Sequence, residues 1–191
     1  MKKIPKLAVL AVLAAVLLVA GSCRSRTDRT PGPVLLTFGA VNGIPTVVSV
    51  TTAIAGTAST PPGVAIQTFT LLSVVKDPNA SITPAIEDVE VSSYQVVYRR
   101  RDTGTRLPPP LVAALAIQVP VNGTSVITNL PIVRLDQLLS PPLGDLASLG
   151  HDPETGTTVI VLDAQITFFG HTLSGDAVSS GTASYTLEFT P

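Results

Sequence analysis

Apolar and polar residues alternate with a period of two near the C-terminal end of the chain. In "TTVIVLDAQITFF" the residues Ile160, Leu162, Ala164, Ile166 and Phe168 share one face, and polar side chains occupy the other. Successive side chains of a β-strand point to opposite sides, so the alternation predicts a strand with one buried face.

The segment "ASYTLEF" repeats this pattern, with Ala183, Tyr185, Leu187 and Phe189 separated by polar residues. Turn-forming residues fill the stretch between the two segments, "GHTLSGDAVSSG". We therefore predict an antiparallel hairpin that ends the domain.

Earlier apolar runs predict six more strands, at Val34–Phe38, Thr46–Ile54, Val64–Val75, Val89–Arg100, Leu115–Val119 and Val126–Val133. The Asn-Gly pair of "VPVNGTSV" is typical of a tight hairpin turn. The apolar phase of the fourth run shifts near Ser92 and Ser93, and a β-bulge of one extra residue explains the shift. About six to eight short strands with regular turns predict an antiparallel β-sandwich.

One segment, "LDQLLSPPLGDLASLG", does not follow the strand pattern. Its leucines fall at helical spacing in two groups, which are Leu135, Leu138 and Leu139, and Leu143, Leu146 and Leu149. Two prolines separate the groups, so we expect two short helical turns rather than one helix. The leucines either cap an open end of the sandwich, or they leave Leu143, Leu146 and Leu149 exposed to dock a partner protein or the membrane.

The composition agrees with an all-β fold. Valine, threonine and isoleucine suit a pleated, half-buried surface, and 17 prolines spread along the chain would interrupt long helices. Hydrophobic residues make up 45% of the chain, which is enough for one core of this size without a metal or a disulfide. The fold class that we predict is all-β, a sandwich with a short helical insertion.

The N-terminal segment reads differently. Three lysines, with no acidic residue among them, precede the apolar run Leu7–Ala20, and the small residues Gly21 and Ser22 lead to Cys23. This layout is typical of a secretory signal. The run is shorter than the roughly 20 residues that a transmembrane helix needs. We predict a signal-peptide helix within residues 1–22.

The stretch "VAGSC" resembles the lipobox of bacterial lipoproteins, although that family usually has leucine where this chain has Ala20. The resemblance covers residues 1–23. It implies that Cys23 receives a diacylglycerol group through its sulfur, becomes the mature N-terminus and is acylated again, with palmitate-like chains. Two or more acyl chains anchor a protein stably to a membrane surface. Cys23 is the one cysteine of the chain, so no intrachain disulfide can form.

Residues 23–33, "CRSRTDRTPGP", read as a polar tether that spans at most about 36 Å. Its three arginines either contact anionic lipid headgroups or act as a solubilising spacer. In lipoproteins of enteric bacteria an aspartate after the lipidated cysteine favours the inner membrane. This chain has Arg24 there, so the resemblance implies the outer membrane in a two-membrane host, with the folded body in the periplasm or outside the cell.

Residues 34–191 form the predicted sandwich domain. Its last segment, "ITFFGHTLSGDAVSSGTASYTLEF", resembles the final hairpin of bacterial immunoglobulin-like or fibronectin-like envelope domains. The resemblance covers about the last thirty residues and implies an immunoglobulin-like topology. Such folds serve adhesion, assembly and spacing, so the resemblance implies no single function.

Two charged stretches are candidates for binding. "YRRRDTGTR" groups Arg99, Arg100, Arg101 and Arg106 around a turn, either as a site for phosphate groups or as a solvated hairpin tip whose charges discourage strand addition. "HDPETG" places two carboxylates on a turn, which could supply part of the 6–8 oxygens of a calcium site or simply form an Asp-Pro turn. We predict no resident metal and no cofactor.

Charge and motif content narrow the function. The loss of three lysines with residues 1–22 moves the formal net charge from −1 to −4, which disfavours general nucleic-acid binding. The sequence lacks a recognisable catalytic motif. We expect a non-catalytic envelope module whose partners are the membrane and another envelope protein. The alternatives are a subunit of a surface filament or adhesin that assembles through strand edges, and a hydrolase with an unrecognised site.

Overall fold

The computed structural model describes residues 32–57, 60–77 and 85–191. Within these ranges the elements are β1 (Val34–Asn42), β2 (Val47–Ser49), α2 (Val50–Ala55), β3 (Val64–Val75), β4 (Val89–Arg100), β5 (Leu111–Val119), β6 (Thr124–Val133), α3 (Leu135–Leu138), α4 (Leu143–Leu149), β7 (Ile160–Thr172), β8 (Ala177–Ser179) and β9 (Ala183–Thr190). The predicted signal-peptide helix and Cys23 lie outside the described residues.

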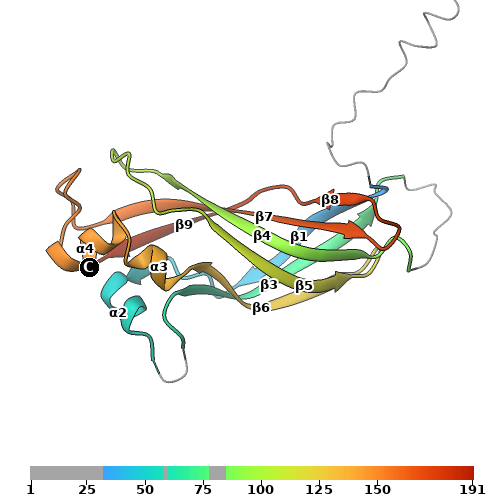
Figure 1. The fold of residues 1–191 in the computed structure, drawn as a ribbon, viewed down its shortest axis with the longest axis horizontal. Coiled ribbons are helices and arrows are strands. Elements are labelled where there is room, and N and C mark those ends of the chain that lie inside the picture. Colours follow the sequence, from blue (N-terminus) through green and yellow to red (C-terminus); the bar gives the residue numbers. More distant parts are fainter. Residues whose placement is uncertain (1–31, 58–59, 78–84) are drawn as a thin grey trace, which may run out of the picture.

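The strands form two sheets that pack as a sandwich-like body (Figure 1). Sheet A has the order β1-β3-β6, and sheet B has the order β2-β9-β7-β4-β5, with β8 also paired to β7. Neighbouring strands are antiparallel, except that β2 runs parallel to β9. The chain is mostly β, as the alternating pattern predicts.

Several strands match the prediction closely. Strands β3 and β4 have the predicted bounds, and the register of β4 shifts between Val91 and Ser93, which confirms the bulge. The apolar face of β7 is buried at every predicted position, from Ile160 to Phe168. Strands β7 and β9 pair antiparallel, with Ile160 opposite Phe189.

The predicted strand Thr46–Ile54 is wrong in its second half. After β2 the chain turns into α2, where the Ser49 hydroxyl accepts a hydrogen bond from the Thr52 N–H and so caps the helix. Val50, the first residue of α2, is fully buried. Burial against the core and the serine cap outweigh the strand preference of the β-branched residues here.

The predicted hairpin at "VNG" is also wrong, although the turn itself exists. Asn122 has a φ of +53°, and the Gly123 N–H donates to the Pro120 carbonyl at 2.9 Å. The strands on its two sides lie in different sheets, β5 in sheet B and β6 in sheet A. The turn therefore carries the chain across the sandwich, because each strand finds its partner elsewhere along the chain.

The core fills the space between the sheets. Its centre is an aromatic cluster in which Phe69 of sheet A and Phe168 of sheet B have ring centroids 5.2 Å apart. Phe38, Tyr94 and Tyr185 surround this pair from both sheets. Contacts of this kind add about 0.5–1.5 kcal/mol beyond the area that they bury.

The two ends of the sandwich differ, as Figure 1 shows. We call one the cap end: it carries α2, α3, α4 and the C-terminus. We call the other the tether end, because the chain enters β1 there and the Lys76 N–H donates to the Pro33 carbonyl. The Pro141–Pro142 bond between α3 and α4 is cis, and the two short helices confirm the predicted helical insertion. No helix in the described ranges has the length and apolar character that crossing a bilayer requires.

Candidate functional site

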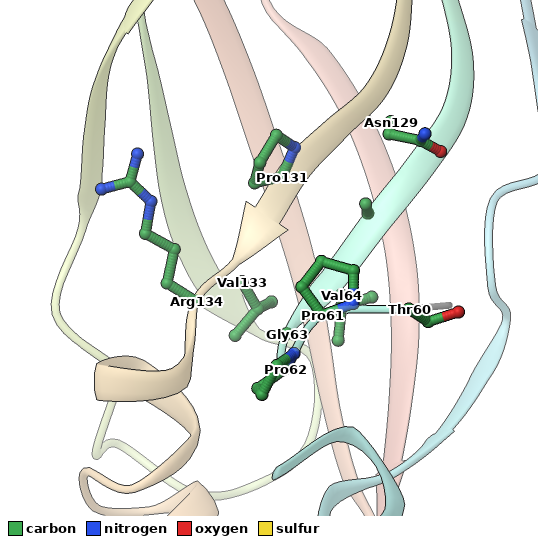
Figure 2. Close-up of a pocket in the computed structure, with 10 residues that line it drawn as sticks. Thr60, Pro61, Pro62, Gly63, Val64, Asn129, Pro131, Val133 and Arg134 are labelled. Atoms are coloured by element: carbon green, nitrogen blue, oxygen red, sulfur yellow. The ribbon is translucent and has the colours of Figure 1, made fainter. Parts of the chain in front are cut away.

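A groove of about 370 Å³ lies at the cap end, between the start of β3 and the end of β6. Pro61, Pro62 and Pro131 line the groove together with Thr60 and Asn129, and Figure 2 shows Pro61 between Pro131 and Pro62. The groove depends on the close approach of two backbones at Gly63. A Cβ atom at Gly63 would come within 2.8 Å of the Val133 carbonyl oxygen, and its φ is +129°.

The groove offers contact surface rather than reactive groups. Of the residues that line it only Arg134 is titratable, and its guanidinium points away from Pro61 in Figure 2. Hydroxyl, amide and proline groups can bind a ligand by shape and hydrogen bonding. They supply no general acid paired with a base.

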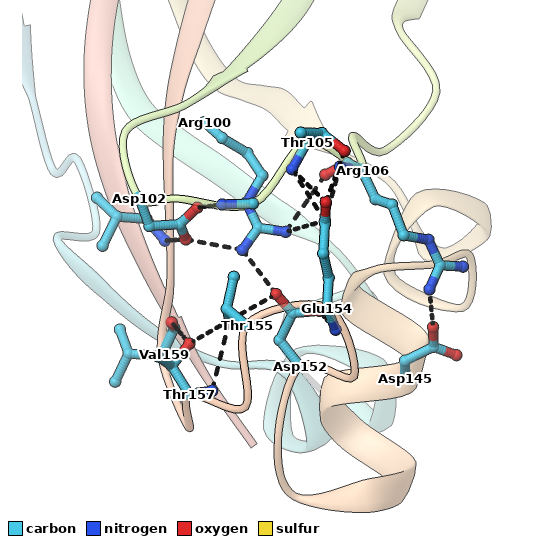
Figure 3. A network of polar contacts seen from close by, with 12 residues as sticks. Arg100, Asp102, Thr105, Arg106, Asp145, Asp152, Glu154, Thr155, Thr157 and Val159 are labelled. Atoms are coloured by element: carbon cyan, nitrogen blue, oxygen red, sulfur yellow. Dashed lines mark hydrogen bonds and ion pairs between the residues drawn. The ribbon is translucent and has the colours of Figure 1, made fainter.

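The second feature of the cap end is a buried arginine, Arg100, the last residue of β4 (Figure 3). Its side chain is only 3% exposed, and it donates hydrogen bonds to two aspartates from different loops. Asp102 is the second residue after β4. Asp152, in the connection between α4 and β7, has its Oδ2 2.8 Å from Arg100 Nη2. The guanidinium therefore joins two long connections that share no backbone ladder.

Each aspartate is in turn held by other donors. Asp102 accepts hydrogen bonds from the backbone N–H groups of Gly104 and Val161, at 3.0 and 3.1 Å. Asp152, whose side chain is fully buried, accepts from the Glu154 N–H and the Thr155 hydroxyl. These additional donors satisfy the remaining lone pairs, which a buried ion pair requires if it is to avoid a large desolvation cost.

Glu154 closes the network from the outside. Its carboxylate accepts hydrogen bonds from the Thr105 N–H, the Thr105 hydroxyl and the Arg106 N–H, all at 3.0 Å or less. It also lies 3.7 Å from Arg100 Nη1. The connection after β4 is thus clamped onto the connection before β7.

The network changes the pKa values of its members. Burial by itself would raise the pKa of Asp102 and of Asp152, but hydrogen bonds from Arg100 and from other donors outweigh burial, so both pKa values fall below the ordinary range. Hydrogen bonds from Thr105 and Arg106 lower the pKa of Glu154. All three carboxylates are therefore charged at neutral pH.

The predicted anion site does not form as one cluster. Arg100 forms ion pairs with carboxylates of this chain, Arg101 lies 3.6 Å from Asp163, and Arg106 lies 3.0 Å from Asp145. Arg99 is exposed. Three of the four arginines thus already face carboxylates of this chain. Arg100, whose side chain is 3% exposed, also does not belong to a solvated hairpin tip.

The same network bears on the calcium hypothesis for "HDPETG". The side chains of Asp152 and Glu154 converge on a guanidinium instead of leaving a space for a cation. Among the described residues no three potential ligand side chains gather in a metal-binding arrangement. The turn is held by the Gly156 N–H, which donates to the Asp152 carbonyl at 2.7 Å.

The three candidate docking leucines separate in the structure. Leu143 and Leu146 are fully buried against the core, whereas Leu149 is 57% exposed. The docking alternative, in which all three leucines stay exposed, is therefore wrong for the first two. They face the core because α4 lies across the open end of the sandwich, which is the capping alternative.

Sequence reasoning missed one further buried polar group at this end. The hydroxyl of Tyr98 donates to the Ile132 carbonyl at 2.6 Å and lies 3.2 Å from the Oε1 of Gln137. Gln137, on α3, also accepts from the Arg134 N–H and donates to the Pro109 carbonyl. Glutamine within a leucine-rich segment gives no sign of burial, so the sequence pattern carried no signal for this bridge.

Comparisons with protein-family models, with curated proteins and with solved structures find no significant match to this chain.

Proposed function

We propose that the protein is a lipid-anchored lipoprotein of the bacterial cell envelope, whose sandwich is a non-catalytic binding or structural module. The observation that carries the proposal is the short apolar run that ends in "VAGSC" at Cys23. A single thiol behind small residues at the end of a signal-like segment suits acylation. Two or more acyl chains would hold the body at a membrane without a spanning helix.

The proposal implies an orientation of the body at the membrane. The chain enters β1 at the tether end, and the stretch from Cys23 to Pro33 reaches at most about 36 Å. The tether end would therefore lie near the bilayer and the cap end would face away from it. The groove between Pro61 and Pro131 would then be open to partners in the aqueous space.

The chemistry of the cap end supports a non-catalytic role. Its buried charged groups, Arg100, Asp102 and Asp152, bind one another and backbone donors. A catalytic acid or base must be free to exchange a proton with the substrate, and it needs a pKa near the working pH. Here the pKa values of both aspartates are lowered rather than raised toward neutrality.

The finer fold assignment, an immunoglobulin-like topology, is part of the proposal. In that fold three strands of one sheet follow the order A-B-E, and the other sheet holds G, F and C. The orders β1-β3-β6 and β9-β7-β4 agree with this arrangement in chain order. Short β2, parallel to β9, extends the second sheet.

Metabolic labelling with palmitate tests the anchor. We expect the wild-type protein to take up label and to sediment with membranes. Cys23→Ser should do neither, whereas Ser22→Ala, which keeps a small residue before the cysteine, should behave as wild type. An unlabelled wild-type protein would show that the lipobox assignment is wrong.

Density fractionation tests the location. In a two-membrane host we expect the labelled protein in the outer-membrane fraction, because Arg24 stands where an aspartate would favour the inner membrane. Recovery wholly with inner-membrane markers would contradict this part of the proposal and leave the anchor intact.

A further inference from the structure

The three strands of sheet A contain no charged residue on either face. Strands β1, β3 and β6 are 9, 12 and 10 residues long, and their sequences are "VLLTFGAVN", "VAIQTFTLLSVV" and "TSVITNLPIV". Soluble surfaces carry about 25–35% charged residues, so roughly one outward position in three or four would ordinarily be charged. The outer face of sheet A departs from that expectation along its whole length.

This outer face mixes aliphatic residues with uncharged polar residues such as Gln67, Thr124 and Thr128, and some of its aliphatic side chains are open to solvent. Leu35, Val74 and Val126, one from each strand, are 40%, 43% and 54% exposed. Leu35 and Val74 are cross-strand neighbours, and Val126 lies opposite Thr70 on the other side of β3. Leu72 lies across Gly39, where a Cβ atom would come within 2.5 Å of its Cδ1, so the middle of the face is filled by an aliphatic side chain.

Sheet B has a different outer surface. Its strands carry Glu90, Arg99, Asp163 and Glu188 on outward or partly exposed positions, together with His171. Water solvates these charged side chains well. If two copies of this face met, like charges near the symmetry axis would face one another. Sheet B also exposes apolar side chains, namely Val47, Val97, Val112 and Phe169. The absence of charge, rather than apolar exposure, therefore distinguishes the outer face of sheet A.

We propose that the outer face of sheet A binds the same face of a second copy of this chain, as a two-fold symmetric dimer on one membrane. The inference rests on the proposed lipid anchor. The strands of sheet A run between the tether end and the cap end, so a two-fold axis parallel to the strands leaves both tethers at the same end. Two copies anchored in one bilayer can then pack side by side without either anchor leaving it.

Symmetry favours a second copy as the occupant. In a two-fold interface each patch meets itself, so any like charges near the axis would be brought together. A face without charges carries no such repulsion. The side chains of two sheets packed face to face interdigitate across about 10 Å, as they do inside a sandwich.

The available area sets the strength of the dimer. Nine residues at about 3.3 Å and three strands at about 4.8 Å make a face of roughly 400 Å², or roughly 800 Å² for two copies. Stable complexes in solution bury about 1,200–2,000 Å² in total. The pair should therefore be weak in dilute solution and should form when anchoring in one membrane raises the effective concentration.

Cysteine crosslinking in membranes tests the interface. Thr70 lies in the middle of β3, the central strand of sheet A, so a two-fold axis places it close to its own symmetry mate. The full-length Thr70→Cys protein, treated in membranes with a short bismaleimide, should give a dimer at about ten-fold the yield of the control, because the two thiols lie one sheet spacing apart. The matched control is Thr167→Cys, a partly buried threonine on the outer side of β7 in sheet B.

Equal yields from the two cysteine variants would overturn the interface, and so would a Thr70→Cys product whose mass shows a different protein. Open-ended ladders, which strand-edge assembly predicts, would also overturn the closed dimer. Dilution of the wild-type protein in detergent should dissociate the dimer into monomers. A dimer that survives strong dilution would contradict the membrane-dependent association that the small area implies.

Introducing a charge into the uncharged face gives an independent test. Val74→Asp places a carboxylate on the outer face of sheet A, where it would face its own copy and should abolish the Thr70→Cys crosslink. Val97→Asp, at a valine on sheet B that is 41% exposed, is the matched control and should leave it unchanged. An unchanged crosslink in Val74→Asp would show that the two faces do not meet.

The same samples separate this inference from the anchor. Palmitate label reports on Cys23, and the crosslink above the background of the parent protein reports on sheet A. Labelled protein without a Thr70→Cys dimer would reject the interface and leave the anchor intact. A specific dimer from unlabelled protein would support the interface and reject the anchor.

Discussion

The tether end and the cap end of the sandwich close the same core by different means. At the tether end, tight turns dock on strands through short-range contacts: the Ser73 N–H donates to the Gly123 carbonyl, and the Val75 N–H donates to the Asn122 side chain. The Leu173 N–H likewise donates to the Asp88 carbonyl. A short turn satisfies many of its own backbone groups. Asp88 is the charged side chain that adds to them here, since it accepts from the Val121 N–H and from the Gln118 amide at 2.9 Å.

At the cap end, the long connections 101–110 and 150–159 meet each other. Arg100, Asp102 and Asp152 hold these two connections together, and Tyr98 and Gln137 join α3 to both sheets. Backbone groups in such connections have no regular ladder, so side chains must supply the partners. The comparison teaches that the cap end depends on a few buried polar groups, whereas stability at the tether end is spread over many weak contacts.

The largest expected effect is at Arg100. Replacing Arg100 by Met removes the guanidinium and leaves buried carboxylates unpaired, which typically costs about 3–5 kcal/mol of unfolding free energy. Arg101→Met is the control, because the Arg101 side chain is 59% exposed and an ion pair of that kind is worth at most about 1 kcal/mol. Urea unfolding of both variants measures the difference. Similar losses would refute the special role of the buried network.

Lowering the pH should lower the unfolding free energy of the wild type through its buried aspartates and raise that of Arg100→Met. In the wild type the pKa values of Asp102 and Asp152 are lowered, so their contribution is complete above about pH 4 and is lost as the pH falls through the folded-state values. Without Arg100, burial should dominate and raise the pKa of Asp152, so protonation then favours the folded state.

The free-energy gap between the two proteins should therefore shrink between pH 7 and pH 3, as measured by unfolding at each pH. A gap that stays constant would mean that the aspartates of the folded wild type do not titrate below their ordinary range.

A smaller effect is expected at Tyr98. Tyr98→Phe removes the hydroxyl that bridges the Ile132 carbonyl and Gln137 in a buried site, at a cost of about 1–3 kcal/mol. The Tyr185 hydroxyl makes no hydrogen bond within the described part of the chain, so Tyr185→Phe should change the unfolding free energy by less than about 0.5 kcal/mol. If the two variants lose equal stability, the inter-sheet bridge contributes nothing beyond the phenyl ring.

The smallest effect is expected at the tether end. Asn122→Gly keeps the positive φ but loses the hydrogen bond to the Val75 N–H, at about 1 kcal/mol. Asn122→Ala should cost a further ~1 kcal/mol, because alanine is strained at a φ of +53°. Thermal or urea unfolding can rank the pair. A loss at Asn122 as large as that at Arg100 would remove the contrast between the two ends.

Much of the strand pattern could be predicted from the sequence. Alternation placed the buried face of β7 correctly, and the phase shift in β4 marked the bulge between Val91 and Ser93. The proline pair marked the break between α3 and α4. Each of these features is local, because the period of burial along a segment is written in its own residues.

The sequence by itself therefore determined most of the strand segments and the buried face of β7. Only the tertiary structure decided which strands share a sheet, that Asn122 and Gly123 turn the chain between sheets, and that Val50–Ala55 is helical. The alternation of Tyr94, Val96 and Tyr98 along β4 already places Arg100 on the inward face, and only the tertiary structure supplied the carboxylates that meet it. Partners such as Asp152 lie about fifty residues away in the chain, and local periodicity carries no information on contacts at that separation.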